Sequence, residues 1–205
     1  MEYLKKAVAG HPATTWTSVV TGPFYDWVCF PILLFPVSLG IKCTVLMIYT
    51  QGLQETSGLW GFDIKNNKAT IYDNGTNIFD TTNLGTVSKA VSKILSVPER
   101  YHNQYVYISE YRISQQDVFD AVQQATGTTV SDWAVEHRTA ESLRQVGYEK
   151  IAKQDFSGAL DLIFAAQFQT GNGSDFSSIR TLENAALGLE QKDLVAVTKT
   201  VVESL

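Results

Sequence analysis

The chain has 205 residues, of which 44% are hydrophobic and 18% are charged, and its formal net charge is −5 at pH 7. This length and composition fit one good-sized globular domain with a sizeable core. The acidic balance argues against a nucleic-acid-binding surface, because phosphate binding needs clustered Lys and Arg. The two cysteines, Cys29 and Cys43, form neither a disulfide framework nor a structural zinc site.

Helices and strands alternate in the first half of the chain. Residues 2–10 have the pattern of an amphipathic helix, which Pro12 stops. Their charges and lack of a long apolar stretch predict no signal peptide and hence a cytoplasmic protein. The β-branched residues of 14–22 predict a buried strand, and Gly22-Pro23 then turns the chain. The next predicted elements are a strand over 68–73, a helix over 83–96 capped by Thr81 or Thr82, and a strand over 104–109.

Helices dominate the second half. Ser114 and Asp117 have the spacing of a capping box, which predicts a helix that ends at Gly127. The remaining predicted elements are a strand over 133–139, helices over 139–153 and 155–168, and a last helix over 190–204. Strands that alternate with helices indicate an α/β fold built from crossover units.

No short motif identifies an active site. Gly171 and Gly173 form the one G-x-G pair of the sequence, but they lack the strand–turn–helix setting of a dinucleotide loop. The three histidines, His11, His102 and His137, are scattered, so we expect no metal site. Asp73 fits an Asp-Asn-Gly turn better than a catalytic pair. The motifs therefore predict no catalytic and no metal-binding residue.

Four segments together resemble a known family: TTWTSVVTGPFYDW, KATIYDNGTNIFDTTNLGTVSKAVSKIL, QYVYISEYRISQQDVFDAVQQATG and EKIAKQDFSGALDLIFAAQF. They are similar to the C-terminal portion of NmrA-like proteins, and more closely of the fungal, CipA-like branch of the isoflavone-reductase-like proteins. The resemblance covers nearly everything except residues 28–51. It implies an incomplete NAD(P)-binding Rossmann-like fold of the atypical short-chain dehydrogenase type, followed by a C-terminal α/β substrate domain.

The resemblance also implies a site. Thr21, Gly22, Pro23 and Phe24 match the family segment at the end of a sheet strand beside the nicotinamide of NADP, so they are the expected cofactor-binding residues. Gly22 would let the backbone approach the ring, and Phe24 and Tyr25 would form an aromatic substrate pocket. The alternative is that these aromatic side chains pack the junction between the domains.

The apolar run over residues 28–51 interrupts the resemblance. Removing these 24 residues joins FYDW to GLQ and restores it, which suggests a translated, retained intron. A membrane segment is the first alternative, although Pro31, Pro36, Gly40 and Lys42 break the run. A soluble insertion is the second. The predicted parts are thus the end of a Rossmann-like domain (1–27), the apolar insertion (28–51) and an NmrA-like substrate domain (52–205).

The family's Gly-rich loop and catalytic lysine have no match in these 205 residues, and Lys5 and Lys6 fall on the wrong side of the matching segment. We therefore expect a full-length protein to be an NADPH-dependent oxidoreductase of a small aromatic or carbonyl substrate, with no nucleic-acid partner and no membrane attachment. This chain alone would neither bind NADP(H) tightly nor turn over. The alternative is a non-catalytic NADP(H) sensor that regulates a partner protein.

Overall fold

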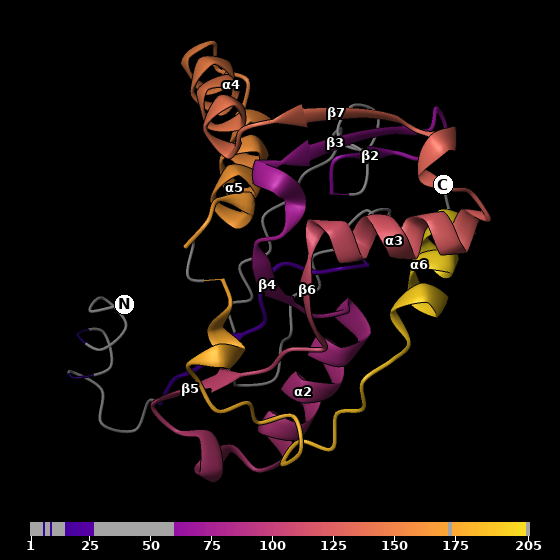
Figure 1. The fold of residues 1–205 in the computed structure, drawn as a ribbon. Helices are drawn as coiled ribbons and strands as arrows, with labels where there is room; N and C mark the ends of the chain where they lie inside the picture. The colour runs from indigo at the N-terminus through magenta and orange to yellow at the C-terminus, as the bar shows by residue number, and fades with distance from the viewer. Residues whose placement is uncertain (1–5, 7–8, 10–14, 27–59, 172–173, 204–205) are drawn as a thin grey trace.

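The computed structural model describes residues 6, 9, 15–26, 60–171 and 174–203. The apolar run over 28–51 and most of the predicted helix over 2–10 lie outside these residues. The described chain forms three small sheets with helices around them, as Figure 1 shows.

The first sheet is a parallel pair made by β1 (Thr17–Val20) and β5 (Gln104–Tyr107), in which Val20 lies opposite Tyr107. The helix α2 (Leu84–Ser96) packs on this pair, and a small core forms between them. Its buried members are Ala90, Ile94, Tyr101, Val106, Ile108 and Leu187. The prediction of a buried first strand is wrong, because Thr17 is exposed and the other three β1 residues are only half-buried.

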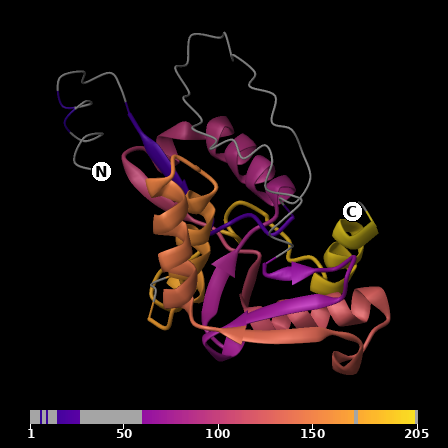
Figure 2. The same ribbon diagram turned by 90° about the horizontal axis from the view of Figure 1, so that it is seen from above.

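The second sheet contains β2 (Phe62–Asp63), β3 (Lys68–Tyr72) and β7 (Ala134–Arg138). The strand β2 is antiparallel to β3, whereas β7 is parallel to it. Alternate side chains of a strand point to opposite faces. Ala69 and Ile71 are accordingly buried in the main core together with the apolar side of α3 (Gln115–Thr126), which runs along the sheet in Figures 1 and 2.

The third sheet pairs β4 (Ile78–Thr81) antiparallel with β6 (Tyr111–Ser114), and it lies between the other two in Figure 1. Two further helices, α4 (Ala140–Ala152) and α5 (Gly158–Phe168), pack side by side beyond the end of β7, as Figure 2 shows. The last helix, α6 (Leu194–Glu203), packs against α3. Short 3-10 helices cover Asp73–Gly75, Pro98–Tyr101, Val130–Asp132 and Phe176–Ser178.

Local sequence signals explain several helix boundaries. Ser114 accepts a hydrogen bond from the Asp117 amide at 3.2 Å, and the Asp117 carboxylate accepts one from the Ser114 amide at 2.7 Å. The predicted capping box is therefore confirmed. Gly127 ends α3 with a φ of 68°. The predicted Asp73 turn is also present, and the Asp73 carboxylate additionally accepts a hydrogen bond from the Ala140 amide at the start of α4, at 3.0 Å.

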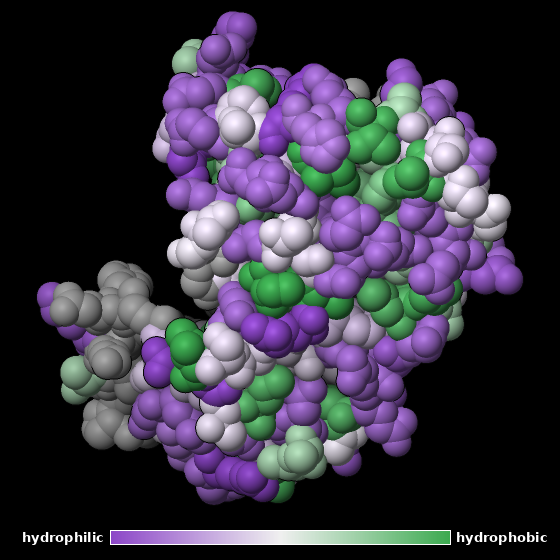
Figure 3. Space-filling view, viewed as in Figure 1, coloured by the Kyte–Doolittle hydropathy of each residue, from purple (hydrophilic) through white to green (hydrophobic). Residues whose placement is uncertain are grey.

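The surface seen in Figure 3 is mostly hydrophilic, with apolar residues gathered in small separate patches. Among the described residues, Phe156 in the turn between α4 and α5 is the most exposed large apolar side chain, at 81%.

Candidate functional site

The predicted cofactor loop, Thr21–Phe24, leaves the carboxyl end of β1. The neighbouring strand β5 runs parallel to β1 and ends at the same edge, so the chain from Ile108 to Glu110 lies beside this loop. A hydrogen bond of 3.0 Å from the Ile108 amide to the Val20 carbonyl joins the two segments there. Ligands of open α/β sheets bind at such carboxyl ends.

Two threonines at the end of β4 hold this loop. The Thr82 hydroxyl donates a hydrogen bond of 2.7 Å to the Thr21 carbonyl, and the Thr81 hydroxyl donates one of 2.6 Å to the Pro23 carbonyl. Both threonines are fully buried. The Thr82 amide also donates to the Pro23 carbonyl at 3.2 Å. These hydrogen bonds fix the backbone of the loop. All four of its residues are half-buried.

Gly22 has a φ of 64°, and a Cβ there would lie 2.0 Å from the backbone oxygen of Asp80. A side chain cannot occupy that space, so the strand β4 requires a glycine at this position. From the sequence, Gly22 was expected to let the backbone approach the nicotinamide ring. In the described residues, Gly22 lets the backbone approach β4. A contact between Gly22 and the cofactor stays a prediction.

Phe24 and Tyr25, the predicted substrate-binding residues, have different surroundings. Phe24 is half-buried and forms an isolated parallel bridge with Thr82. Tyr25 is completely buried, and its ring lies 6.4 Å from that of Trp60 and 5.4 Å from that of Tyr111. Tyr25 therefore packs in the main core. Phe24 is the better candidate for a ligand contact.

Buried polar side chains, including those of Asn83 and Glu110, lie at the start of α2. The predicted caps, Thr81 and Thr82, are wrong, because Asn83 is the N-cap residue and its own side chain does not cap the helix. Carboxylates from other segments do so instead. Asp26 accepts a hydrogen bond from the Leu84 amide at 2.7 Å, and Glu110 accepts one from the Asn83 amide at 3.2 Å. This arrangement places negative charge at the helix N-terminus, where it is stabilising.

Tyr25 and Tyr111, which lie beside these side chains, keep their phenol protons over the physiological pH range. Burial raises the pKa of Tyr25 to about 12, although its hydrogen bond with Thr198 acts in the opposite direction. The two hydroxyl oxygens lie 2.5 Å apart. Burial likewise raises the pKa of Tyr111, whose hydroxyl accepts a hydrogen bond from the side-chain nitrogen Nδ2 of Asn83 at 3.2 Å. These phenols are structural hydrogen-bonding groups rather than ready proton donors.

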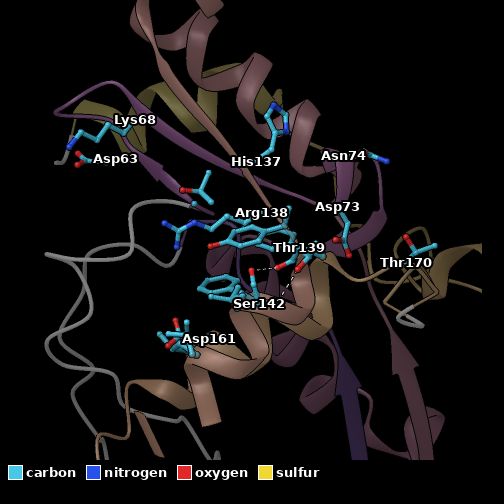
Figure 4. Close-up of a pocket in the computed structure, with 18 of the residues that line it drawn as sticks. Asp63, Lys68, Asp73, Asn74, His137, Arg138, Thr139, Ser142, Asp161 and Thr170 are labelled. Carbon is cyan, nitrogen blue, oxygen red and sulfur yellow. Dashed lines mark hydrogen bonds between the residues drawn. The ribbon is translucent and has the colours of Figure 1, made fainter. Parts of the chain in front are cut away.

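The structure also contains a cavity of about 1230 Å³ between the second sheet and the α4–α5 pair. Figure 4 shows several of its polar residues, including the hydrogen-bonded Thr139 and Ser142 at the start of α4. The remaining lining residues come from β2, β3, β7, α4, α5 and the adjoining turns. They are Gly61, Asp63, Lys68, Thr70, Tyr72, Asp73, Asn74, His137, Arg138, Leu143, Val146, Lys150, Leu160, Asp161, Phe164, Phe168 and Thr170.

Within the described ranges, no group of three or more His, Cys, Asp or Glu residues could hold a metal ion. None of the helices in that part of the chain is long and apolar enough to cross a membrane. The run over residues 28–51 lies outside both findings.

Sequence comparison relates the chain to two fungal oxidoreductases, and no family model matches it. It is 26% identical over 203 residues to oxidoreductase aprR of Aspergillus flavus, which covers 99% of this chain and 58% of that protein. It is 26% identical over 170 residues to oxidoreductase poxI of Penicillium oxalicum, covering 83% of this chain and 45% of that protein. The chain thus spans about half the length of the curated relatives it matches.

Structural comparison relates the fold to a nucleoside-diphosphate-sugar epimerase of Staphylococcus aureus, with a TM-score of 0.54 and 13% identity. The match covers 97% of this chain and 56% of that one. Together with the parallel pairs β1–β5 and β3–β7, it confirms the predicted α/β, Rossmann-like fold class.

Sequence reasoning missed several of the residues that shape these sites. Glu110 follows a strand that was predicted, so its place at the sheet edge could have been anticipated. The side chain of Gln115 gave no such signal. Its amide nitrogen donates to the Trp60 and Thr70 carbonyls at 2.8 and 2.9 Å, and its amide oxygen accepts from the Tyr72 amide at 2.9 Å.

Proposed function

We propose that this chain forms one side of the nicotinamide site, at the carboxyl ends of the parallel strands, in a longer NADP(H)-dependent oxidoreductase. The longer protein acts on a small aromatic or carbonyl compound. The observation that carries the proposal is the position of Thr21–Phe24 at the joint carboxyl end of the parallel strands β1 and β5. The fold and the two relatives named as oxidoreductases support it. The NmrA-like, isoflavone-reductase-like branch and the preference for NADP belong to this proposal.

The residues present fit a nicotinamide at this edge. The loop is half-exposed, its backbone is held by Thr81 and Thr82, and Phe24 offers an aromatic surface. When bound, the cofactor would supply the hydride. The role of this chain would be to position the ring and the substrate and to exclude water through Phe24. The proton donor would come from the upstream portion of the longer protein.

A consequence concerns the 205 residues by themselves. They contain no Gly-rich phosphate loop, and backbone amides of such a loop supply much of the binding of a dinucleotide. The isolated chain should therefore bind NADP(H) weakly and should not turn over. The cytoplasmic location and the predicted partners stay predictions as well.

The proposal is tested first by sequencing the mature transcript from well upstream of Met1 through the codon for Gly52. We expect a message that joins Trp27 directly to Gly52 and encodes a Gly-rich loop upstream. An upstream lysine at the family position would favour the reductase, and a loop without that lysine would favour the NADP(H) sensor. A message that starts at Met1 and retains residues 28–51 would overturn the proposal.

The second test uses the protein encoded by that message. NADPH titration followed by nicotinamide fluorescence should show that Phe24→Ala weakens binding about tenfold, because an aromatic contact with the nicotinamide is lost. The matched control is Phe156→Ala, which removes an aromatic side chain that is 81% exposed in the α4–α5 turn. Equal affinities for the two variants would exclude the assigned role of Phe24.

A further inference from the structure

The sheet wall of the cavity presents a row of polar side chains. Lys68, Thr70 and Tyr72 occupy alternate positions of β3, so they share the face that does not pack on α3. Arg138 lies opposite Tyr72 in the parallel register of β3 and β7, and it joins the same face. In Figure 4 the imidazole of His137 lies on the other side of this strand.

The carboxylates that line the cavity are already engaged by the protein. Asp161 forms an ion pair of 2.7 Å with Lys150 across the α4–α5 pair. Asp63 accepts hydrogen bonds from the Asn66 amide and side chain at 3.2 and 2.8 Å. Asp73 accepts from the Ala140 amide, as described above.

The donors on the sheet wall are less fully used. Arg138 binds the Glu136 carboxylate through Nε and Nη2 at 2.9 and 3.0 Å, and a guanidinium has five N–H donors. Three donors of Arg138 therefore remain available. Lys68 has no ion pair, and the Tyr72 hydroxyl has no hydrogen-bond partner, among the residues that the structure describes. This wall therefore carries unused hydrogen-bond donors.

Tyr72 keeps its proton at neutral pH. Burial raises the pKa of its phenol, the positive charge of Arg138 lowers it in part, and the carboxylates of Asp161 and Glu136 raise it further. Its hydroxyl can therefore donate a hydrogen bond to an oxygen acceptor beside the guanidinium.

An aromatic stack continues from Tyr72 on the sheet wall to two phenylalanines of α5. The rings of Tyr72 and Phe168 are stacked with centroids 5.3 Å apart, and those of Phe164 and Phe168 are stacked at 5.9 Å. The interplanar angles are 6° and 8°, so the three rings are nearly parallel. Both phenylalanines line the cavity, but Phe168 is buried whereas Phe164 is half-buried. A flat ring can extend this stack on the cavity side of Phe164.

We propose that this cavity is a second ligand site that binds a planar aromatic carboxylate, with its ring against Phe164 and its carboxylate at Arg138 and Tyr72. The site is separate from the predicted nicotinamide edge, because its lining includes none of residues 21–26, 82–84 or 108–111. Its existence does not depend on the proposed oxidoreductase function.

The test is calorimetric titration of the 205-residue chain with 2-naphthoate, in the absence of NADPH. Two comparison ligands separate the contributions: 2-naphthalenemethanol keeps the ring without the charge, and acetate keeps the charge without the ring. We expect naphthoate to bind at least about tenfold more tightly than either. Absence of naphthoate binding, or equal binding of the neutral alcohol, would overturn the proposal.

Variants locate the ligand. Arg138→Gln and Phe164→Ala should each weaken naphthoate binding about tenfold, while circular dichroism shows that both remain folded. The matched control is Arg180→Gln, which removes an arginine that lies over the Tyr107 ring, outside the cavity lining. Loss of binding in the control, or unchanged affinity in Arg138→Gln, would place the ligand elsewhere. Because the calorimetry needs no NADPH, a lack of naphthoate binding would not count against the proposed oxidoreductase function, which has its own test.

Discussion

Single backbone positions decide how closely the segments of this fold approach one another. Gly22 and Gly127 have nearly the same conformation, with φ of 64° and 68°. A Cβ at Gly22 would overlap the Asp80 carbonyl, whereas a Cβ at Gly127 would meet nothing within 4 Å. The two positions therefore separate the cost of a left-handed backbone from the cost of a steric clash.

We predict that Gly22→Ala destabilises the chain far more than Gly127→Ala. The left-handed conformation alone costs an L-residue about 1–2 kcal/mol. At Gly22 the clash with a buried backbone adds to this, so the loss in the free energy of unfolding should exceed about 3 kcal/mol. Urea denaturation measures both variants. Similar midpoints for the two would show that β4 can move away from Gly22.

A second residue-scale prediction concerns Tyr25 and alkaline pH. Its phenol ionises near pH 10 in the unfolded chain and at about 12 in the folded one, so the unfolded state loses its proton first. The free energy of unfolding should therefore be intact below pH 10 and fall by about 1.4 kcal/mol per pH unit between 10 and 12. Tyr25→Phe should remove this part of the slope in urea titrations from pH 8 to 11. The matched control is Tyr148→Phe, which removes a phenol that is 55% exposed.

At the scale of elements, the α4–α5 pair depends on two glycines that meet at the helix crossing. A Cβ at Gly147 would lie 2.8 Å from the Gly158 carbonyl oxygen, and one at Gly158 would lie 2.3 Å from the Gly147 oxygen. Helices approach this closely only where side chains are absent. The glycines therefore set how α5 presents Phe164 and Phe168 to the cavity.

We predict that Gly158→Ala destabilises the chain by about 2 kcal/mol, although alanine favours a helix over glycine by about 1 kcal/mol. The same change in α2 is the control. A Cβ at Gly85 would contact only the Lys192 Nζ at 3.9 Å, so Gly85→Ala should be neutral or stabilising. Thermal unfolding followed by circular dichroism compares them. A stabilising Gly158→Ala would mean that the two helices can separate without cost.

Most elements could be predicted from local patterns, because apolar periodicity and capping residues are properties of neighbouring positions. The helices α2, α3 and α4 start within one or two residues of their predicted starts. The strands β2, β4 and β6 were missed. The strand β2 has two residues, and β4 and β6 are four-residue segments whose pairing partners are each other. Such short strands exist because of a distant partner, which local periodicity does not reveal.

At the scale of the whole molecule, one core joins both sides of the region over residues 27–59. Tyr25 and Trp60 stack at 6.4 Å, and both belong to the main cluster with Phe79, Tyr111 and Phe168. The end of the predicted Rossmann-like part and the predicted substrate domain therefore share buried surface. The predicted boundaries at 27 and 52 remain predictions.

If residues 28–51 are a retained intron, their removal should not damage this core. Nine residues would then connect Tyr25-Asp26 to Trp60, and this is ample for side chains that are already in contact. We predict that the deletion variant is at least as stable as the full chain and less prone to aggregate, because an apolar run of 24 residues is absent. Urea denaturation and light scattering measure the two effects. An insoluble deletion variant would show instead that the run belongs to the fold.

The sequence by itself determined the fold class, most of the helices, the capping box at Ser114 and the likeness of the Thr21–Phe24 segment to a cofactor loop. Each of these depends on residues that are near one another in the chain or on a pattern along it. Only the tertiary structure decided that Gly22 faces Asp80, that Tyr25 lies in the core, and that Arg138, Tyr72 and Phe164 share a cavity. These facts depend on which distant segments pack together, and that is fixed by the burial of the whole chain rather than by any single stretch of it.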